Sequence, residues 1–153
     1  MDWKHFVQEH STLMRAGAQI ELGTAAHPSW PPCRRELPTV MLFSAHPDDE
    51  ILSMGPLARR FREEGSRVIC VAMTVGRPAH MERRLSELQG ATTHMGYELI
   101  IPDGAVDGGG GIDTERHTRA VRALIEAHRP TVVVTHHADD WHVAHILTNQ
   151  VVM

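Results

Sequence analysis

Thr39-Val-Met-Leu-Phe-Ser-Ala-His-Pro-Asp-Asp-Glu50 is the stretch that decides the fold, because an apolar run ends there in a histidine, a proline and three acids. Residues 40–43 show no polar alternation, which is typical of a parallel strand covered on both faces. Pro47 and the acids after it suit the turn that opens a helix. Ligands of open α/β sheets lie just beyond the carboxyl ends of the strands. We therefore expect the polar side chains after this strand to stand at a binding site: His46, Asp48, Asp49 and Glu50.

Two interpretations of this stretch are open. His46 and Asp49 lie three apart across the turn and can both point inward, and an imidazole with a carboxylate suits zinc or another borderline divalent metal. Alternatively, Asp48 or Asp49 caps the helix by accepting free backbone N–H groups, and His46 is an ordinary strand-end histidine. This stretch alone does not decide between a metal site and a cap.

A second cluster favours the metal. After the apolar run 131–135 the chain reads His136-His-Ala-Asp-Asp-Trp-His-Val-Ala-His145. His142 and His145 lie three apart where a helix is expected to begin, so they share one face. A histidine-rich loop taken alone is often only solvated surface. Two ligand-rich clusters, each at the end of a strand-like run, indicate one shared site.

These two motifs resemble a known family. Ala45-His-Pro-Asp-Asp-Glu50 and Asp139-Asp-Trp-His-x-x-His145 look like the LmbE-like/PIG-L family of zinc-dependent N-acetylglucosamine deacetylases. The likeness runs from Thr39 to the C-terminus and includes Arg84-x-x-Glu87 leading into Met95-Gly96. The resemblance implies a hydrolase that removes an acetyl group from an N-acetylated amino sugar, using water activated by zinc. By residue, it implies zinc ligands His46, Asp49 and His145, a general base at Asp48, help at the carbonyl from His142, and a substrate contact from Arg84 or Arg83.

The chain departs from the family pattern in two places. The last motif usually reads His-Pro-Asp-His, whereas here it reads His142-Val-Ala-His145, so the acid that commonly orients the histidines is missing at Ala144. Family members also usually continue well past the third ligand. We therefore expect a deacetylase domain over residues 39–153 whose C-terminal part is missing. The apolar end at residues 150–153 then predicts a homo-oligomer, because exposed apolar surface drives association.

Length and composition limit the classes of function. A chain of 153 residues predicts one main domain, and a net charge of -4 with 42% hydrophobic residues indicates neither nucleic acid nor an acidic membrane surface as a partner. A small-molecule amino sugar is the partner that the resemblance implies. Cys70 in a core strand and Cys33 in a proline-rich linker indicate reduced thiols and a cytoplasmic protein without a membrane span.

The order of the remaining segments predicts the architecture. Residues 1–38 read as an amphipathic helix over 2–22 and a linker that contains Pro28, Pro31 and Pro32. Strands are expected at 68–74 and 97–101, and helices at 51–64, 81–95 and 114–128. This alternation predicts a Rossmann-like three-layer α/β/α fold with a mostly parallel sheet. For His145 to reach His46, the strands before them must be neighbours, which requires the order 3-2-1-4.

Three other functions are weighed against the deacetylase. Two histidines and one carboxylate also form the site of non-haem Fe(II) enzymes, so Fe²⁺ is an alternative metal, although those sites usually lie on all-β scaffolds. A catalytically impaired metal-binding domain stays open because of Ala144. A nucleotide-binding Rossmann module is disfavoured, because the glycines at 108–111 lack a phosphate-binding fingerprint and predict a flexible loop instead.

Overall fold

The computed structural model describes residues 2–17, 19, 36–105 and 111–153, which form two units. The contacts divide the chain into residues 1–34 and residues 35–153. In the first unit, helix α1 spans Trp3–Gly17, and residues 18 and 20–22 of the helix expected over 2–22 lie outside the described residues. The proline-rich linker and Cys33 lie outside the described residues. A domain boundary after residue 38 and the packing of α1 on the domain stay predictions.

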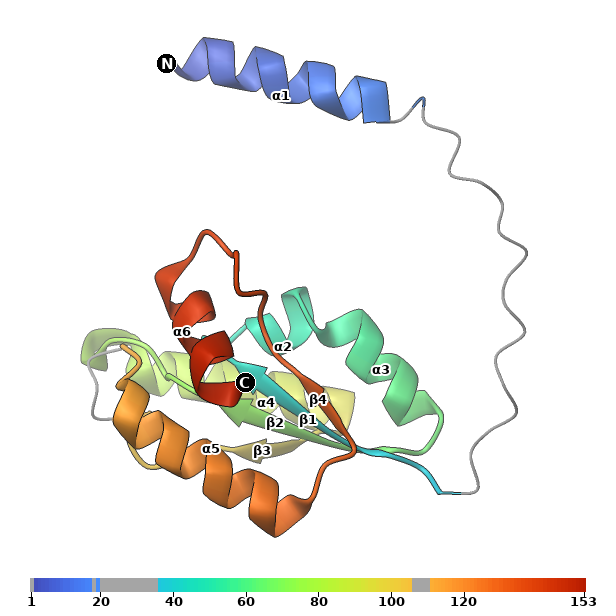
Figure 1. Cartoon of the computed structure of the whole chain (residues 1–153), viewed down its shortest axis with the longest axis vertical. Coiled ribbons are helices and arrows are strands. Elements are labelled where there is room, and N and C mark those ends of the chain that lie inside the picture. The colour runs from blue at the N-terminus through green and yellow to red at the C-terminus, as the bar shows by residue number, and fades with distance from the viewer. Residues whose placement is uncertain (1, 18, 20–35, 106–110) are drawn as a thin grey trace. The chain divides into compact units, whose positions relative to one another are not determined.

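The second unit is built on a four-stranded parallel sheet in the order β3-β2-β1-β4. Strand β1 (Thr39–Ser44) lies in the middle, paired on one side with β2 (Arg67–Ala72) and on the other with β4 (Val132–Val134). Strand β3 (Glu98–Ile100) flanks β2. Figure 1 shows the strands side by side. The expected order 3-2-1-4 is confirmed.

Helices cover both faces of this sheet, because β1 alternates between two cores. Val40 and Leu42 face helix α3 (Gly55–Glu63) and the end of helix α4 (Met81–Met95). Met41 and Phe43 face the opposite core, which helices α5 and α6 close. The members of that core from these helices are Val121, Leu124 and Ile125 of α5 (Thr114–His128) and Val151 and Val152 of α6 (Val143–Val152). The α/β/α architecture is therefore confirmed.

One expected helix is broken. Residues 51–64 do not form a single helix; α2 (Asp49–Leu52) ends and α3 begins again at Gly55, with Pro56 in its first turn. Proline suits a helix start because it has no N–H to leave unpaired there. A single helix over 51–64 would turn Leu52 and Leu57 inward, but with the break they are 77% and 50% exposed.

The other two helices confirm their predicted bounds. Helix α4 ends at Met95 because Gly96 adopts φ 69°, the left-handed conformation that commonly terminates helices. Helix α5 begins after Asp113, whose carboxylate accepts the backbone N–H of Arg116. The expected loop over 75–80 contains one short 3₁₀ turn, η1 (Pro78–His80). The glycine loop lies largely outside the described residues, since 106–110 are not placed.

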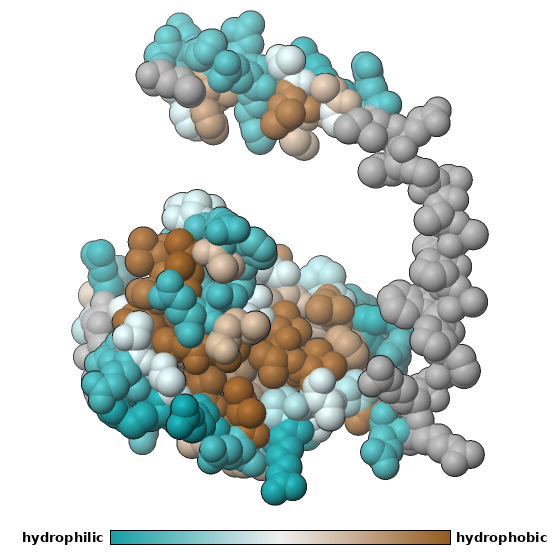
Figure 2. All heavy atoms as spheres, viewed as in Figure 1, coloured by the Kyte–Doolittle hydropathy of each residue, from teal (hydrophilic) through white to brown (hydrophobic). Residues whose placement is uncertain are grey.

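Hydrophobic side chains also reach the surface of the second unit. Val133 on β4 and Val143 and Met153 around α6 are exposed, and Figure 2 shows hydrophobic residues over this face. Cys70 is buried with a free thiol, and burial raises its pKa, so the thiol is inert. None of the described helices combines the length and apolarity that a membrane crossing requires. Homo-oligomer formation and a cytoplasmic location stay predictions.

Candidate metal centre

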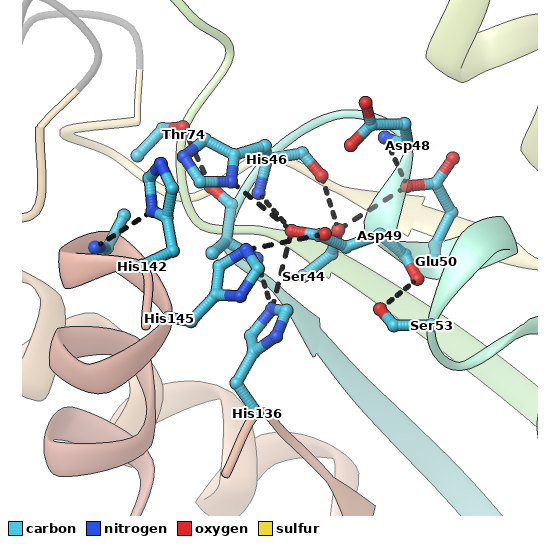
Figure 3. Close-up of polar contacts among 12 residues, drawn as sticks. Ser44, His46, Asp48, Asp49, Glu50, Ser53, Thr74, His136, His142 and His145 are labelled. Carbon is cyan, nitrogen blue, oxygen red and sulfur yellow. Dashed lines mark hydrogen bonds and ion pairs between the residues drawn. The ribbon is translucent and has the colours of Figure 1, made fainter. Parts of the chain in front are cut away.

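The two sequence clusters meet at one edge of the sheet. Because β1 and β4 are parallel neighbours, the loops that follow them leave from the same edge (Figure 3). His46 Nδ1 lies 3.4 Å from Asp49 Oδ2, and His145 Nε2 lies 3.5 Å from Asp49 Oδ1. The ring centroids of His46 and His145 are 5.3 Å apart. The structure thus brings together the three residues expected to bind the metal.

Asp49 contacts three histidines of this cluster: His46, His136 and His145. Its carboxylate turns back toward β1 and accepts the backbone N–H of His46 at 2.8 Å, so it does not cap helix α2. The residue is 8% exposed. Burial raises the pKa of Asp49, but the histidines around its carboxylate, His136 and His46, lower it by more. The net pKa lies well below the usual range, so Asp49 is an anion at neutral pH.

His145 is oriented by a carboxylate. Its Nδ1–H donates to Asp140 Oδ2 at 3.0 Å, which turns Nε2 toward Asp49. Such an acid behind a histidine fixes its tautomer and raises its strength as a metal ligand. The backbone N–H of His142 also donates to Asp140, and these two bonds lower the pKa of Asp140. Residue 144 is an alanine, as the sequence shows, and Asp140 is the acid that bonds His145 here.

His136 is a member of the cluster whose role the sequence did not reveal. It is 7% exposed and its ring stacks on that of His145, with centroids 3.8 Å apart. His136 Nε2 accepts the backbone N–H of Ala45 at 3.1 Å, and it lies 3.4 Å from Asp49 Oδ2. A nitrogen whose lone pair accepts an amide proton has none left for a metal. While its Nε2 accepts the Ala45 N–H, we expect His136 to support the ligands, although its donor atom also lies in one of the convergent sets.

His142 stands beside the three ligands at the start of α6. Its Nδ1 accepts the backbone N–H of Ala144 at 3.3 Å, and its ring meets that of His46 edge-on, with centroids 4.6 Å apart. Burial lowers the pKa of His142, and the neighbouring rings of His46 and His145 lower it further. A neutral ring that accepts through Nδ1 carries its proton on Nε2. His142 is thus a hydrogen-bond donor next to the ligands.

Asp48 is exposed and leaves its carboxylate uncommitted. It precedes helix α2, but its side chain makes no capping hydrogen bond, so the cap interpretation fails for Asp48 as it does for Asp49. Its backbone N–H donates to Glu50 Oε2 at 2.9 Å. Glu50 is 1% exposed, and burial raises the pKa of its carboxyl group.

A cavity of about 400 Å³ opens next to this end of the cluster. It is lined by Asp48 and by Arg84 of α4, the residue expected to contact substrate. Glu87 pairs with Arg83 at 2.8 Å and not with Arg84, which corrects the expected i,i+3 pair. Gly76, with φ 84°, lies so close to Arg84 that a Cβ there would stand 2.9 Å from the arginine Cδ. Arg83 lines the cavity as well, and of the two arginines Arg84 is the one that Gly76 confines.

The donor set fits a catalytic metal. The metal-binding atoms of His46, His142 and His145 lie within 4.8 Å of one another, as do those of Asp49, His136 and His145. With His136 bonded to Ala45, the remaining donors are the Asp49 carboxylate and the imidazoles of His46, His142 and His145. The expected trio of His46, Asp49 and His145 draws on both sets, which share His145. Three such ligands suit zinc or another borderline divalent ion and leave a coordination position free for water or substrate.

The fold and this centre define a class: a Rossmann-like α/β protein with a two-histidine, one-carboxylate site at the carboxyl edge of its sheet. The chain belongs to the PIG-L family, whose model, described as GlcNAc-PI de-N-acetylase, matches residues 41–153. A relative from Mycobacteroides abscessus, a 1D-myo-inositol 2-acetamido-2-deoxy-alpha-D-glucopyranoside deacetylase, is 32% identical over 130 residues. The match covers 63% of this chain and 47% of the relative, so the chain spans about half the length of that protein.

Solved structures share the fold. The A40926 pseudoaglycone deacetylase Dbv21 matches with a TM-score of 0.63 and 20% identity, over 76% of this chain and 57% of that one. The N,N'-diacetylchitobiose deacetylase from Pyrococcus horikoshii matches with a TM-score of 0.59 and 19% identity, over 99% and 57%. GalB, a 4-carboxy-2-hydroxymuconate hydratase from Pseudomonas putida, matches with a TM-score of 0.63 and 17% identity, over 75% of this chain and 54% of that one. Since deacetylases and a hydratase share this fold, the reaction must be argued from the site.

Proposed function

We propose that this chain carries the metal centre of a zinc-dependent N-deacetylase that acts on an N-acetylglucosamine-type conjugate. The observation that carries the proposal is the convergence of His46, Asp49 and His145 beside an uncommitted carboxylate, Asp48. The family and the names of its deacetylase relatives support the choice of an amide bond and an amino sugar. An Fe(II) enzyme is not favoured, because the relatives are deacetylases and the scaffold is α/β.

The proposed reaction is hydrolysis of the acetamide to acetate and a free amine. Zinc held by His46, Asp49 and His145 would polarise the amide carbonyl and make a nearby water molecule more acidic. Asp48 accepts the proton that this water loses as its oxygen attacks the carbonyl carbon. The same proton then passes from Asp48 to the amine nitrogen when the C–N bond breaks.

His142 and Arg84 take the other two roles in this proposal. The Nε2–H of His142 donates to the carbonyl oxygen as negative charge develops there, which stabilises the transition state. Arg84 lines the cavity beside Asp48, where its guanidinium donors suit hydroxyl or phosphate oxygens of a sugar conjugate. His142 acts here as a hydrogen-bond donor and not as an acid, because its Nδ1 accepts the Ala144 N–H and its pKa is lowered by burial and by the neighbouring rings.

Removing the ligand from the second cluster tests the proposal. His145→Ala should lose zinc and acetate release together, because two ligands from the first cluster rarely hold zinc tightly. Native mass spectrometry gives the zinc stoichiometry, and acetate release from N-acetylglucosamine conjugates gives the activity. His137→Ala is the matched control, since His137 lies in the same loop with a side chain that is 79% exposed. Unchanged zinc in the His145 variant would rule out the two-cluster site.

A further inference from the structure

Asp48 has an unusual backbone for a residue with a side chain. Its φ is 136° and its ψ is -27°, which lies outside the regions that L-amino acids commonly adopt. Among the described non-glycine residues, Arg129 also has a positive φ, but at 45° it adopts the ordinary left-handed conformation after a helix. A strained backbone of this kind persists only where neighbouring groups hold it.

Two sets of hydrogen bonds hold Asp48. On one side, its carbonyl oxygen accepts the backbone N–H groups of Ile51 at 3.0 Å and Leu52 at 2.8 Å. On the other side, its N–H donates to Glu50 Oε2 at 2.9 Å, as Figure 3 shows. The first set belongs to helix α2 and would form behind many residues. The second depends on one side chain, that of Glu50.

Glu50 is itself held in place below the surface. Ser44 Oγ donates to the carbonyl oxygen of His46 at 2.6 Å and lies 3.4 Å from Glu50 Oε2. Burying a carboxyl group is unfavourable unless hydrogen bonds compensate, and Glu50 is 1% exposed. Glu50 is not among the groups whose donor atoms converge for a metal, and the proposed reaction leaves it without a chemical step. A purely apolar residue would fill this position at lower cost if only packing mattered.

We propose that Glu50 is a positioning residue, which fixes the strained backbone of Asp48 by accepting its N–H and so holds the Asp48 carboxylate at the edge of the cavity. The inference rests on the proposed function in assigning the general base to Asp48. The hydrogen bond is a property of the fold and is measurable without any reaction. Glu50 also lines the cavity, but in this proposal it acts through Asp48 and takes no chemical step itself.

The kinetic test distinguishes the effect of losing the hydrogen-bond acceptor from the effect of changing the side-chain volume. Glu50→Gln keeps a carbonyl oxygen that can accept the Asp48 N–H, whereas Glu50→Leu keeps similar bulk and removes the acceptor. In the leucine variant kcat should fall by about tenfold to a hundredfold, the range for a misplaced catalytic group, while KM and zinc stoichiometry stay close to wild type. The glutamine variant should restore most of kcat.

Thr92→Val serves as a control for buried polar substitutions. Thr92 is 2% exposed and its hydroxyl donates to the Leu88 carbonyl within helix α4, and Thr92 is neither a cavity-lining residue nor a metal donor. This variant should lower the melting temperature without lowering kcat. Wild-type kcat in Glu50→Leu would overturn the proposal, and an equal loss in the glutamine and leucine variants would show that charge, not the acceptor, is what matters.

Hydrogen exchange at the Asp48 amide tests the hydrogen bond to Glu50 independently of activity. NMR should find this amide protected in the wild-type and glutamine proteins and exchanging quickly in Glu50→Leu. If the leucine variant does not fold, the wild-type amide still decides, because fast exchange there would refute the hydrogen bond. If neither the wild-type protein nor any variant releases acetate but the exchange pattern holds, the proposed function fails. The role of Glu50 in holding Asp48 then still stands.

Discussion

The residues after β1 and the residues after β4 offer the metal the same kinds of ligand, but the fold holds them differently. The first group follows a buried central strand paired on both sides, and its side chains bond its own nearby backbone, as the Asp49 carboxylate does with the His46 N–H. The second group follows a strand of three residues, and side chains fix it: Asp140 holds His145, and Asn149 Nδ2 donates to the His136 carbonyl at 2.8 Å. The sheet therefore fixes the position of the β1 group. In the β4 group, single substitutions of the supporting side chains should weaken metal binding without abolishing it.

The largest effect should come from the two adjacent acids of the β1 group. Asp48→Asn should keep its metal and lose about 10²- to 10⁴-fold in kcat, because it removes only the proton acceptor. Asp49→Asn should weaken metal binding, with activity partly recovered in excess zinc. Zinc stoichiometry and acetate release on both variants distinguish the two roles. Equal metal loss in both would mean that the base is assigned to the wrong residue.

An intermediate effect should follow from loosening the β4 group. Asp140→Asn keeps the size of the side chain but removes the anionic partner of His145 Nδ1. Zinc affinity should fall by about 10- to 100-fold, the usual consequence of losing an acid behind a histidine ligand. Competition with a chelator measures this change. Asp139→Asn is the matched control, because the Asp139 side chain is 93% exposed. Equal affinities in the two variants would contradict the orienting role of Asp140.

The smallest effect should appear where the two groups touch, at His136 and Ala45. His136→Ala leaves the buried N–H of Ala45 without an acceptor, which should cost about 1–3 kcal/mol of folding stability. His136→Gln offers an oxygen in place of the ring nitrogen and should recover part of that loss. Urea unfolding of the metal-free proteins gives the difference. If His136→Ala instead abolishes zinc binding while keeping its stability, His136 is a ligand and not a support.

The sequence predicts the part of the molecule that regular patterns determine. The buried run before His46, the Met95-Gly96 helix end and the placement of His145 predict the strand order and the helices over 81–95 and 114–128. The apolar spacing over 51–64 predicts one helix there, whereas Gly55-Pro56 starts a new one.

The contributions of His136 and Asp140 could not be found in the same way. His136 acts by accepting the N–H of Ala45, a contact that exists only after β4 has paired with β1. Asp140 reaches His145 across the turn that precedes α6, so its role depends on the path of a loop and not on helical or strand periodicity. The roles of the individual site residues stay predictions until the variants are measured.

The pairing of β4 with β1 also has a consequence for how the chain folds as it is synthesised. His46 and Asp49 follow β1 and His145 follows β4, so a growing chain displays two of the proposed ligands long before the third exists. Contacts between segments so distant in sequence form late and slowly. If these residues hold a metal, its affinity develops only when all three are in place, so metal binding should follow the pairing of β4 with β1 and stabilise it.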